Sequence, residues 1–202
     1  MHSTSSRILL ARQPIVGRDH ATVAHELLYR SADEREGALF VDDAIATATV
    51  VDTAFRRFGI ETVVGRSRAL VNVDADFLLS RRVEELPSGS VMLELLETID
   101  IDASIVARCW SLKERGYPIA LDDVCRYDSR FEPILEFADV VKIDVLQLDR
   151  SSLAKLVRQL RPWPARLLAE KVETASALRH CAELGFDFFQ GFLCGKPQVL
   201  AA

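Results

Sequence analysis

The sequence predicts an α/β fold in which parallel strands alternate with helices and close into a single TIM-like (β/α) barrel. Three observations support this prediction: short apolar runs recur along the chain, helical segments separate most of them, and polar residues stand at their ends. Strands separated by helices usually pair in parallel through right-handed crossovers. Because the chain holds seven or eight such units, a closed barrel is favoured over an open sheet.

Eight mainly apolar runs account for the predicted strands. They cover residues 8–16, 23–29, 69–73, 91–96, 118–124, 139–145, 166–172 and 186–190. The first run ends at Gly17, and the fourth is interrupted by Glu94. Apolar runs of this length, bounded by polar or turn residues, are typical of strands that are buried on both faces.

The predicted helices lie between these runs and carry capping side chains. Three of them begin after Asp42 or Asp43, after Asp102 and after Thr174, and stop at Gly59, Gly116 and Gly185. A polar cap at the start and a glycine at the end is the usual arrangement of helix termini. A fourth helix is expected from Ser151 or Ser152 to about Leu160, and helical turns are expected near 76–80 and 130–137.

Composition restricts the class of protein. The 202 residues are 49% hydrophobic and 27% charged, which is ordinary for one globular domain with a sizeable core. The formal net charge of −5 argues against a broad surface for duplex nucleic acid. Any phosphate ligand must therefore be bound by a local group of residues.

The cysteines and the N-terminal residues indicate the compartment. Four cysteines stand far apart, without a C-x-x-C pair or a histidine at zinc-ligand spacing, so we expect reduced thiols. Residues 1–6 are polar and are expected to form a disordered tail before a single domain over 7–202. No signal peptide or apolar stretch of membrane-spanning length is present, which predicts a cytoplasmic protein without a membrane partner.

Polar residues at the ends of the predicted strands are the candidates for function. They are Glu26, Asn72, Glu94, Asp122, Asp123, Lys142, Glu170 and Gln190. In a β/α barrel these strand ends converge on one face. Taken singly, each residue is more simply a satisfied core or surface group, but several carboxylates in one pocket would repel each other. The collective pattern therefore predicts a site for divalent cations, with Lys142 as a buried lysine that needs a partner.

The motifs around these residues resemble those of the EAL family of cyclic di-GMP phosphodiesterases over nearly the whole chain. They are QPI at 13–15, ELLYR at 26–30, VNV at 71–73, E-x-x-E at 94–97, LDD at 121–123, KID at 142–144, AEKVET at 169–174, QG at 190–191 and GKP at 195–197. Leu27 replaces the alanine that gives the family its name. The details of the first, second and seventh motifs are similar to the subgroup in which an EAL domain precedes an HDOD domain, which is absent from this chain.

The resemblance implies a two-metal phosphodiesterase site on an EAL-type barrel. The residues that match the family's metal ligands are Glu26, Asn72, Glu94 and Asp122 for one Mg²⁺ or Mn²⁺, with Asp122 and Asp123 for a second. All-oxygen ligand sets suit these hard cations. The implied product is linear pGpG, formed by opening one phosphodiester bond of cyclic di-GMP.

The remaining matched positions imply roles around the metals and the substrate. Lys142 would orient water or offset developing charge, Glu170 would support the metal and water network, and Gln190 would position its neighbours. Gln13, Arg30 and Pro197 would lie against the nucleotide, and Glu97 would steady the loop after the aspartate pair. The resemblance also implies a homodimer, and an HDOD domain or another signalling protein as a partner.

The segment after the aspartate pair departs from the family pattern. An active member reads D-D-F-G-x-G-Y-S-S, whereas this chain reads Asp122, Asp123 and then VCRYDSR over 124–130. Both glycines are replaced, and glycine permits backbone conformations that other residues adopt only at some cost. A catalytically inactive module that binds cyclic di-GMP or a protein therefore stays open as an alternative. A Schiff-base aldolase that uses Lys142 is a weaker alternative, because the surrounding acids should raise the lysine pKa.

Overall fold

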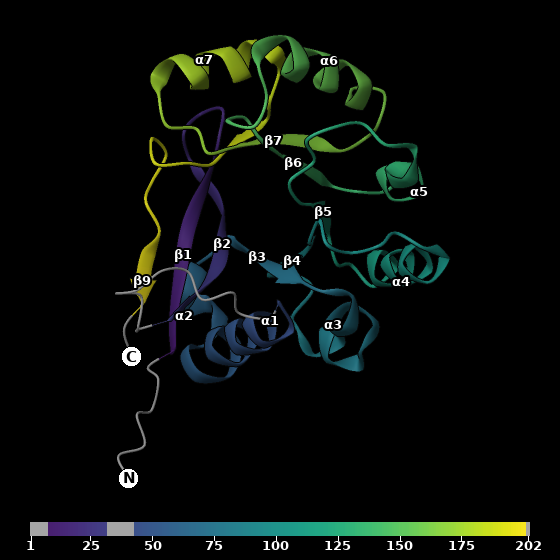
Figure 1. The fold of residues 1–202 in the computed structure, drawn as a ribbon. Helices are drawn as coiled ribbons and strands as arrows, with labels where there is room; N and C mark the ends of the chain where they lie inside the picture. Colours follow the sequence, from purple (N-terminus) through teal and green to yellow (C-terminus); the bar gives the residue numbers. More distant parts are fainter. Residues whose placement is uncertain (1–7, 32–42, 201–202) are drawn as a thin grey trace.

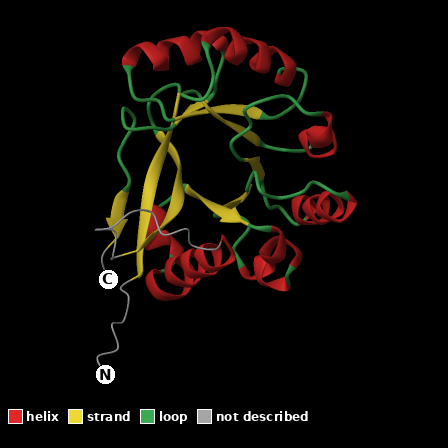
Figure 2. Ribbon diagram, in the orientation of Figure 1, coloured by secondary structure: helices red, strands yellow, loops and turns green. Residues whose placement is uncertain are grey.

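The fold is a closed barrel of strands surrounded by helices (Figures 1 and 2). A computed structural model describes residues 8–31 and 43–200, so the predicted tail over 1–6 and Asp42 lie outside the described residues. The strands are β1 Ile8–Gly17, β2 Thr22–Ser31, β3 Arg68–Val73, β4 Val91–Leu95, β5 Ile119–Leu121, β6 Val140–Asp144, β7 Arg166–Glu170, β8 Phe188–Phe189 and β9 Gln198–Leu200. The predicted barrel is thus confirmed.

The strand order shows how the barrel closes. It runs β2, β3, β4, β5, β6, β7, β8, β1, β9, and an additional pairing of β1 with β2 completes the ring. Pairs from β2 to β8 are parallel, whereas β1 is antiparallel to β2, β8 and β9. The expected parallel pairing of strands separated by helices is confirmed for β2 to β8. Strand β1 is antiparallel because only the four residues 18–21 join it to β2, and so short a connection makes a hairpin.

Helices cover the outside of the barrel. They are α1 Asp43–Val51, α2 Ile60–Val64, α3 Ala75–Leu79, α4 Ala103–Glu114, α5 Glu132–Leu135, α6 Arg150–Leu160 and α7 Ala175–Leu184. A π-helical segment, Asp52–Phe58, continues α1, and 3₁₀ turns cover Arg81–Glu85 and Ser129–Phe131. Figure 1 shows α6 and α7 side by side outside β6 and β7. Among the described residues, no helix has the length and apolar character needed to cross a membrane.

The caps of the long helices agree with the sequence at two of the predicted positions. Asp102 accepts hydrogen bonds from Ser104 and Ile105 at the start of α4, and Thr174 accepts one from Ala177 at the start of α7. Helix α6 begins at Arg150, just before the expected start at Ser151 or Ser152, and its cap is Asp149, which accepts from the backbone of Ser152. An ionised aspartate one turn earlier is an equally good acceptor and also favours the positive end of the helix dipole.

Among the described residues, the interior contains two separate apolar groups. The larger one lies between the strands and the surrounding helices, and includes Val71, Leu93, Leu112 and Ile143. The smaller one lies on the other face of the strands, inside the barrel, and comprises Ile15, Ala24, Leu70, Met92, Ala120, Val140 and Leu168, with Phe188 packed against it. Because side chains alternate along a strand, the residues two positions further along these strands also face the barrel interior.

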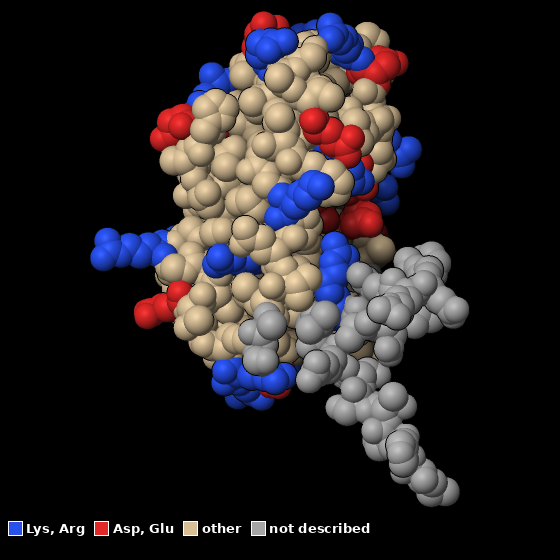
Figure 3. All heavy atoms as spheres, turned by 90° about the vertical axis from the view of Figure 1, so that its left-hand side faces the viewer, with Lys and Arg blue, Asp and Glu red and all other residues tan. Residues whose placement is uncertain are grey.

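The surface carries charges of both signs. On the face shown in Figure 3, Lys and Arg side chains lie in separate groups, interspersed with Asp and Glu and with uncharged surface.

Candidate functional site

The predicted site residues lie at one end of the barrel. Asn72, Glu94, Lys142 and Glu170 stand at or within two residues of the carboxyl ends of β3, β4, β6 and β7. Glu26 stands in the middle of the longer strand β2, and Asp122 and Gln190 follow β5 and β8 directly. Each stands two positions after a member of the small apolar group inside the barrel or, for Gln190, after Phe188, which packs against that group. The strand pattern therefore builds the barrel interior as an apolar layer with a polar layer above it.

Lys142 occupies the centre of the polar layer. Its side chain is 1% exposed, and its ammonium contacts Glu94, lies 2.9 Å from Asp122 and 2.9 Å from Glu170, and lies 3.7 Å from Glu26. Each carboxylate comes from a different strand or from the residue after it. The prediction that Lys142 is buried and needs partners is confirmed.

Burial and charge set the protonation of this cluster. Burial lowers the pKa of Lys142, but the four carboxylates more than offset it and hold that pKa well above its ordinary value. A lysine that stays protonated cannot be the nucleophile of a Schiff-base aldolase. Burial raises the pKa of Glu94 well above its ordinary value and that of Glu170 to about 7, although Lys142 acts in the opposite direction on both.

The cluster holds more acidic than basic groups, and this excess of negative charge favours the binding of a divalent cation. One ammonium faces four carboxylates. Two buried oxygens beside it, Oδ1 of Asn72 and Oε2 of Glu94, have no hydrogen-bond partner among the described residues. Buried oxygens without partners are unusual, and carboxylate and amide oxygens are the ligands that Mg²⁺ and Mn²⁺ prefer. The donor set therefore fits a hard divalent cation.

The carboxylates around Lys142 do not form a ready metal site among the described residues. Within the described ranges, no group of three or more His, Cys, Asp or Glu side chains is already arranged around one point where a metal could sit. A cation would have to share the carboxylates with the ammonium, which is possible because Glu94 has one free oxygen.

Gln190 connects the cluster to β1. Its amide nitrogen lies 2.5 Å from Oε2 of Glu26 and 3.3 Å from Oε1 of Gln13, and it is placed to donate to both. The amide of Gln13 in turn donates to the backbone carbonyl of Gly195 at 3.0 Å. The structure thus brings Gln13, Glu26 and Gln190 together and connects them to the segment before β9.

Asp123 is separated from the lysine cluster. Its backbone has a positive φ of 42°, which aspartate tolerates better than most residues. Its carboxylate accepts hydrogen bonds from Gln147 at 3.1 Å, and the same amide donates to Asp144. The two adjacent aspartates therefore have different partners: Asp122 faces Lys142 and Asp123 faces Gln147. Their predicted joint role at a second metal stays a prediction.

Sequence reasoning missed the polar group around Asp144. This carboxylate is 2% exposed and is paired with Lys171, whose backbone φ is 55°. Hydrogen bonds from Lys171, Leu146 and Gln147 lower the pKa of Asp144, although burial acts in the opposite direction. An aspartate that ends a buried apolar strand was the available signal.

The loop after the aspartate pair avoids backbone strain. Over 124–130, no residue has a positive φ. Val124 is buried, Tyr127 donates to Glu132, and the Arg130 side chain pairs with Asp128. The replaced glycines are therefore not needed for the conformation that this loop adopts.

Three further predicted residues lie at the edge of the site. Glu97 is exposed and makes no hydrogen bond or ion pair with the described residues, so its role in steadying the loop stays a prediction. Arg30 lies on β2 with Glu26, and Pro197 directly precedes β9. Their contacts with a nucleotide stay predictions.

The fold and the site together define a TIM-like barrel with an acidic, oxygen-rich site at the carboxyl ends of its strands. A family model described as the EAL domain matches residues 3–197. The chain therefore belongs to the EAL domain family, which confirms the resemblance noted in the sequence.

Two curated relatives match most of the chain. The uncharacterized protein YuxH of Bacillus subtilis (strain 168) is 32% identical over 199 residues, which is 96% of this chain and 48% of YuxH. The cyclic di-GMP phosphodiesterase CdgJ of Vibrio cholerae serotype O1 is 31% identical over 193 residues, which is 95% of this chain and 44% of CdgJ. The chain thus spans about half the length of these relatives.

Solved EAL structures share the fold. The Bacillus subtilis protein YkuI, solved with cyclic di-GMP and calcium, superposes with a TM-score of 0.71 at 21% identity, over 96% of this chain and 56% of YkuI. At this identity the likeness shows the barrel fold alone.

Proposed function

We propose that this protein is a metal-dependent phosphodiesterase that hydrolyses cyclic di-GMP to linear pGpG in bacterial second-messenger signalling. The observation that carries the proposal is the convergence of four carboxylates on Lys142, beside two buried oxygens without partners. Membership of the EAL family and the likeness to CdgJ support the choice of substrate.

The proposed metal ligands are the oxygen donors at the strand ends. Glu26, Asn72, Glu94 and Asp122 would hold one Mg²⁺ or Mn²⁺, and Asp123 would join Asp122 at a second. When bound, such cations activate water and neutralise charge on the transferring phosphate. Asp123 would have to release Gln147 before it could serve.

The other polar residues would act on water and on the phosphate. Lys142 would donate hydrogen bonds to the charge that develops on phosphate oxygens, because its ammonium stays protonated. Glu170, with a pKa of about 7, would accept a proton from the attacking water near neutral pH. Gln190 would hold Glu26 in position.

Binding of the nucleotide would fall to residues at the rim. Arg30 would contact a phosphate, since a guanidinium can donate two parallel hydrogen bonds to it. Gln13 and Pro197 would lie against the rest of the ligand, next to the contact between Gln13 and Gly195. A cytoplasmic location, a homodimer and an HDOD partner stay predictions from the sequence.

A second candidate is a receptor that binds cyclic di-GMP without hydrolysing it. The observation that favours it is that Lys142 already takes the central place among the carboxylates. A small misplacement of supporting groups can lower a rate about 100-fold while the ligands remain.

Incubation with cyclic di-GMP separates the two candidates. The purified protein would be incubated with Mn²⁺ or Mg²⁺, with and without EDTA, and the products resolved by chromatography. We expect pGpG that EDTA abolishes, loss of product in Glu26→Gln, and unchanged product in Glu114→Gln, which removes an exposed carboxylate of α4. Calorimetric binding without product would instead support the receptor, and neither binding nor product would contradict both.

A further inference from the structure

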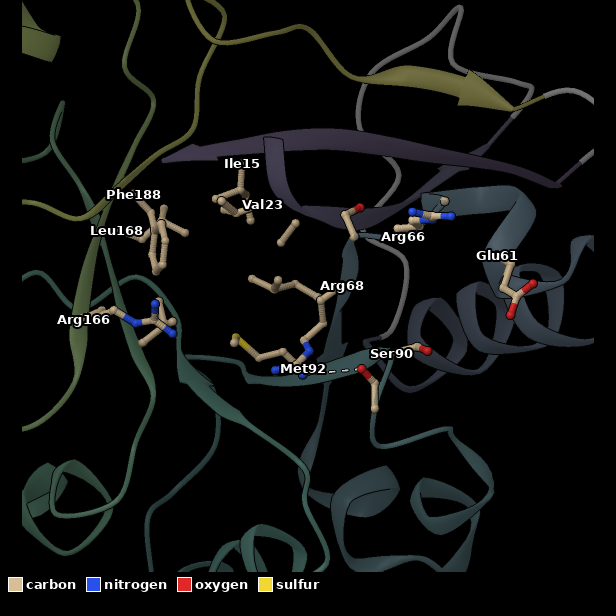
Figure 4. Close-up of a pocket in the computed structure, with 16 residues that line it drawn as sticks. Ile15, Val23, Glu61, Arg66, Arg68, Ser90, Met92, Arg166, Leu168 and Phe188 are labelled. Carbon is tan, nitrogen blue, oxygen red and sulfur yellow. Dashed lines mark hydrogen bonds between the residues drawn. The ribbon is translucent and has the colours of Figure 1, made fainter. Parts of the chain in front are cut away.

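A cavity of about 840 Å³ lies at the end of the barrel opposite the acid cluster (Figure 4). Its floor is formed by the apolar layer inside the barrel, including Ile15, Leu70, Met92 and Leu168. These residues stand on the amino-terminal side of the site residues on the parallel strands. The cavity therefore has no residue in common with the site already described.

The walls of the cavity combine apolar and basic side chains. Figure 4 shows Arg166, Leu168 and Phe188 on one side of the open space, with Arg68 and Met92 on another. The Arg166 guanidinium lies 4.8 Å from the centre of the Phe188 ring. A guanidinium stacked on a ring keeps its N–H groups free to bind an anion in its own plane.

The two wall arginines lack acidic partners. Among the described residues, the Arg166 side chain makes no hydrogen bond or ion pair, and Arg68 donates only to the carbonyl of Gly89 at 3.4 Å. Elsewhere on the chain, Arg56, Arg108 and Arg130 pair with carboxylates. The guanidinium groups of Arg68 and Arg166 are therefore not neutralised by a carboxylate among the described residues.

The lining as a whole is positively charged. It contains Arg66, Arg68 and Arg166 but a single carboxylate, Glu61, and the hydroxyls of Ser67 and Ser90 add neutral hydrogen-bonding groups. Glu61 lies on α2, away from Arg166 in Figure 4. Ligand pockets of about 300–1,000 Å³ that pair an apolar wall with a few polar groups are typical of small-molecule sites.

We propose that this cavity binds a small organic anion, with its charged group between Arg68 and Arg166 and its apolar portion against Met92 and Phe188. The charged group is a carboxylate, sulfonate or phosphate, since two guanidinium groups suit planar or tetrahedral oxyanions. The proposal does not depend on hydrolysis of cyclic di-GMP, because it rests on the other end of the barrel.

The occupant is a free small molecule rather than a bilayer or a second protein. The apolar groups of the floor are at most 7% exposed for Ile15, Leu70, Met92 and Leu168. They lie at the bottom of a recess whose edge is polar. A recess of this kind admits a compact ligand, whereas a flat surface would be needed for wide apolar contact.

Fluorescence titration with 8-anilinonaphthalene-1-sulfonate tests the proposal. This probe joins a permanent negative charge to two aromatic groups, and N-phenyl-1-naphthylamine is the same skeleton without the charge. The variants are Arg68→Gln, Arg166→Gln and the double substitution, and the matched control is Arg158→Gln on the exposed face of α6. Circular dichroism and the unfolding midpoint verify that each variant is folded.

We expect one sulfonate probe per chain, with a dissociation constant raised at least about fivefold in each single variant and unchanged in the control, since each substitution removes a charged hydrogen-bond donor. The neutral probe should bind more weakly and should not respond to the variants. Equal binding of both probes, or sulfonate binding that ignores Arg68 and Arg166, overturns the proposal. Absence of probe binding also overturns it. The proposal fails as well if Arg68 and Arg166 affect only self-association of the protein, or only its attachment to phosphatidylglycerol vesicles, and not binding of the probe.

Discussion

Replacement of Lys142 by methionine tests whether its ammonium balances the buried acids. Methionine keeps the length of the side chain but leaves Glu94, which is fully buried, together with Asp122 and Glu170 without their cation. At 2.9 Å, the Coulomb attraction of Lys142 to Asp122 or to Glu170 is about 6 kcal/mol at an effective dielectric constant of about 20, before desolvation is counted. Desolvation offsets much of this, and the loss of one partner from a buried pair typically costs about 3–5 kcal/mol.

The expected loss is a large part of the stability of a domain, which is about 5–15 kcal/mol. Urea unfolding of the wild type and Lys142→Met, followed by circular dichroism at pH 8 in EDTA, should differ by about 3–5 kcal/mol. Lys155→Met on the exposed side of α6 is the matched control and should change little.

Two conditions should reduce the difference between Lys142→Met and the wild type. Mn²⁺ binds only the folded state and supplies the missing positive charge, so it should stabilise the variant more than the wild type. A lower pH should act in the same direction, because burial raises the pKa of Glu94 and Glu170 and a protonated acid needs no cation. A loss below about 1 kcal/mol at pH 8, or a loss that neither condition alters, would refute the role of Lys142 as the counter-charge.

Three further substitutions test the surroundings of the site. Asp144→Asn should destabilise the protein by about 1–3 kcal/mol at pH 7. Lys171 and its neighbours lower the pKa of Asp144 below its unfolded value, so the wild type is the more stable protein above about pH 4 and loses this advantage as the pH falls through the folded pKa. The acid unfolding curves of the two proteins should therefore converge. Cys125→Gly should lower the unfolding free energy by about 0.5–1 kcal/mol without raising the rate of hydrolysis, because φ is not positive there; a faster enzyme would show that the loop limits turnover. Gly191→Ala should lower the free energy of unfolding in urea by at least about 2 kcal/mol, since φ is 149° and a Cβ would lie 2.3 Å from backbone atoms of Val172, after β7. An unchanged unfolding midpoint would mean that this segment can move.

The barrel could be predicted because its strand pattern is local. A buried parallel strand needs apolar residues on both faces, so runs such as 91–95 and 140–144 are recognisable in the sequence alone. The interruption of such a run by Glu94 or Lys142 marks the position where the strand reaches the polar layer. The site residues could therefore be located together with the strands that carry them.

Features that depend on distant pairing could not be predicted in the same way. The predicted strands 118–124 and 186–190 are longer than β5 and β8, which end where their neighbours stop pairing. Strand β9 forms because Gln198 to Leu200 pair with Leu10 to Arg12 of β1, at the other end of the described sequence. Neither the length of a partner strand nor a contact of that range is contained in a local apolar pattern.

The contacts of the individual acids depended on side-chain geometry. Adjacent aspartates could be expected to act together, yet the positive φ of Asp123 turns its carboxylate toward Gln147 while Asp122 faces Lys142. The pairing of Lys171 with Asp144 likewise follows from a positive φ at the lysine. A residue with positive φ changes the direction of the chain locally, and at Asp123 and Lys171 no glycine marks that conformation in the sequence.

The alternation of side chains along the strands explains why the two ends of the barrel have different chemistry. On β3, Leu70 and Asn72 both face the interior, and on β4 Met92 and Glu94 do the same, so the cavity floor and the acid cluster are successive layers on the same strands. A shift of one residue in a strand would turn its members of both layers outward. The register that buries the apolar layer is therefore the register that brings the acids together, and selection on either end of the barrel constrains the other.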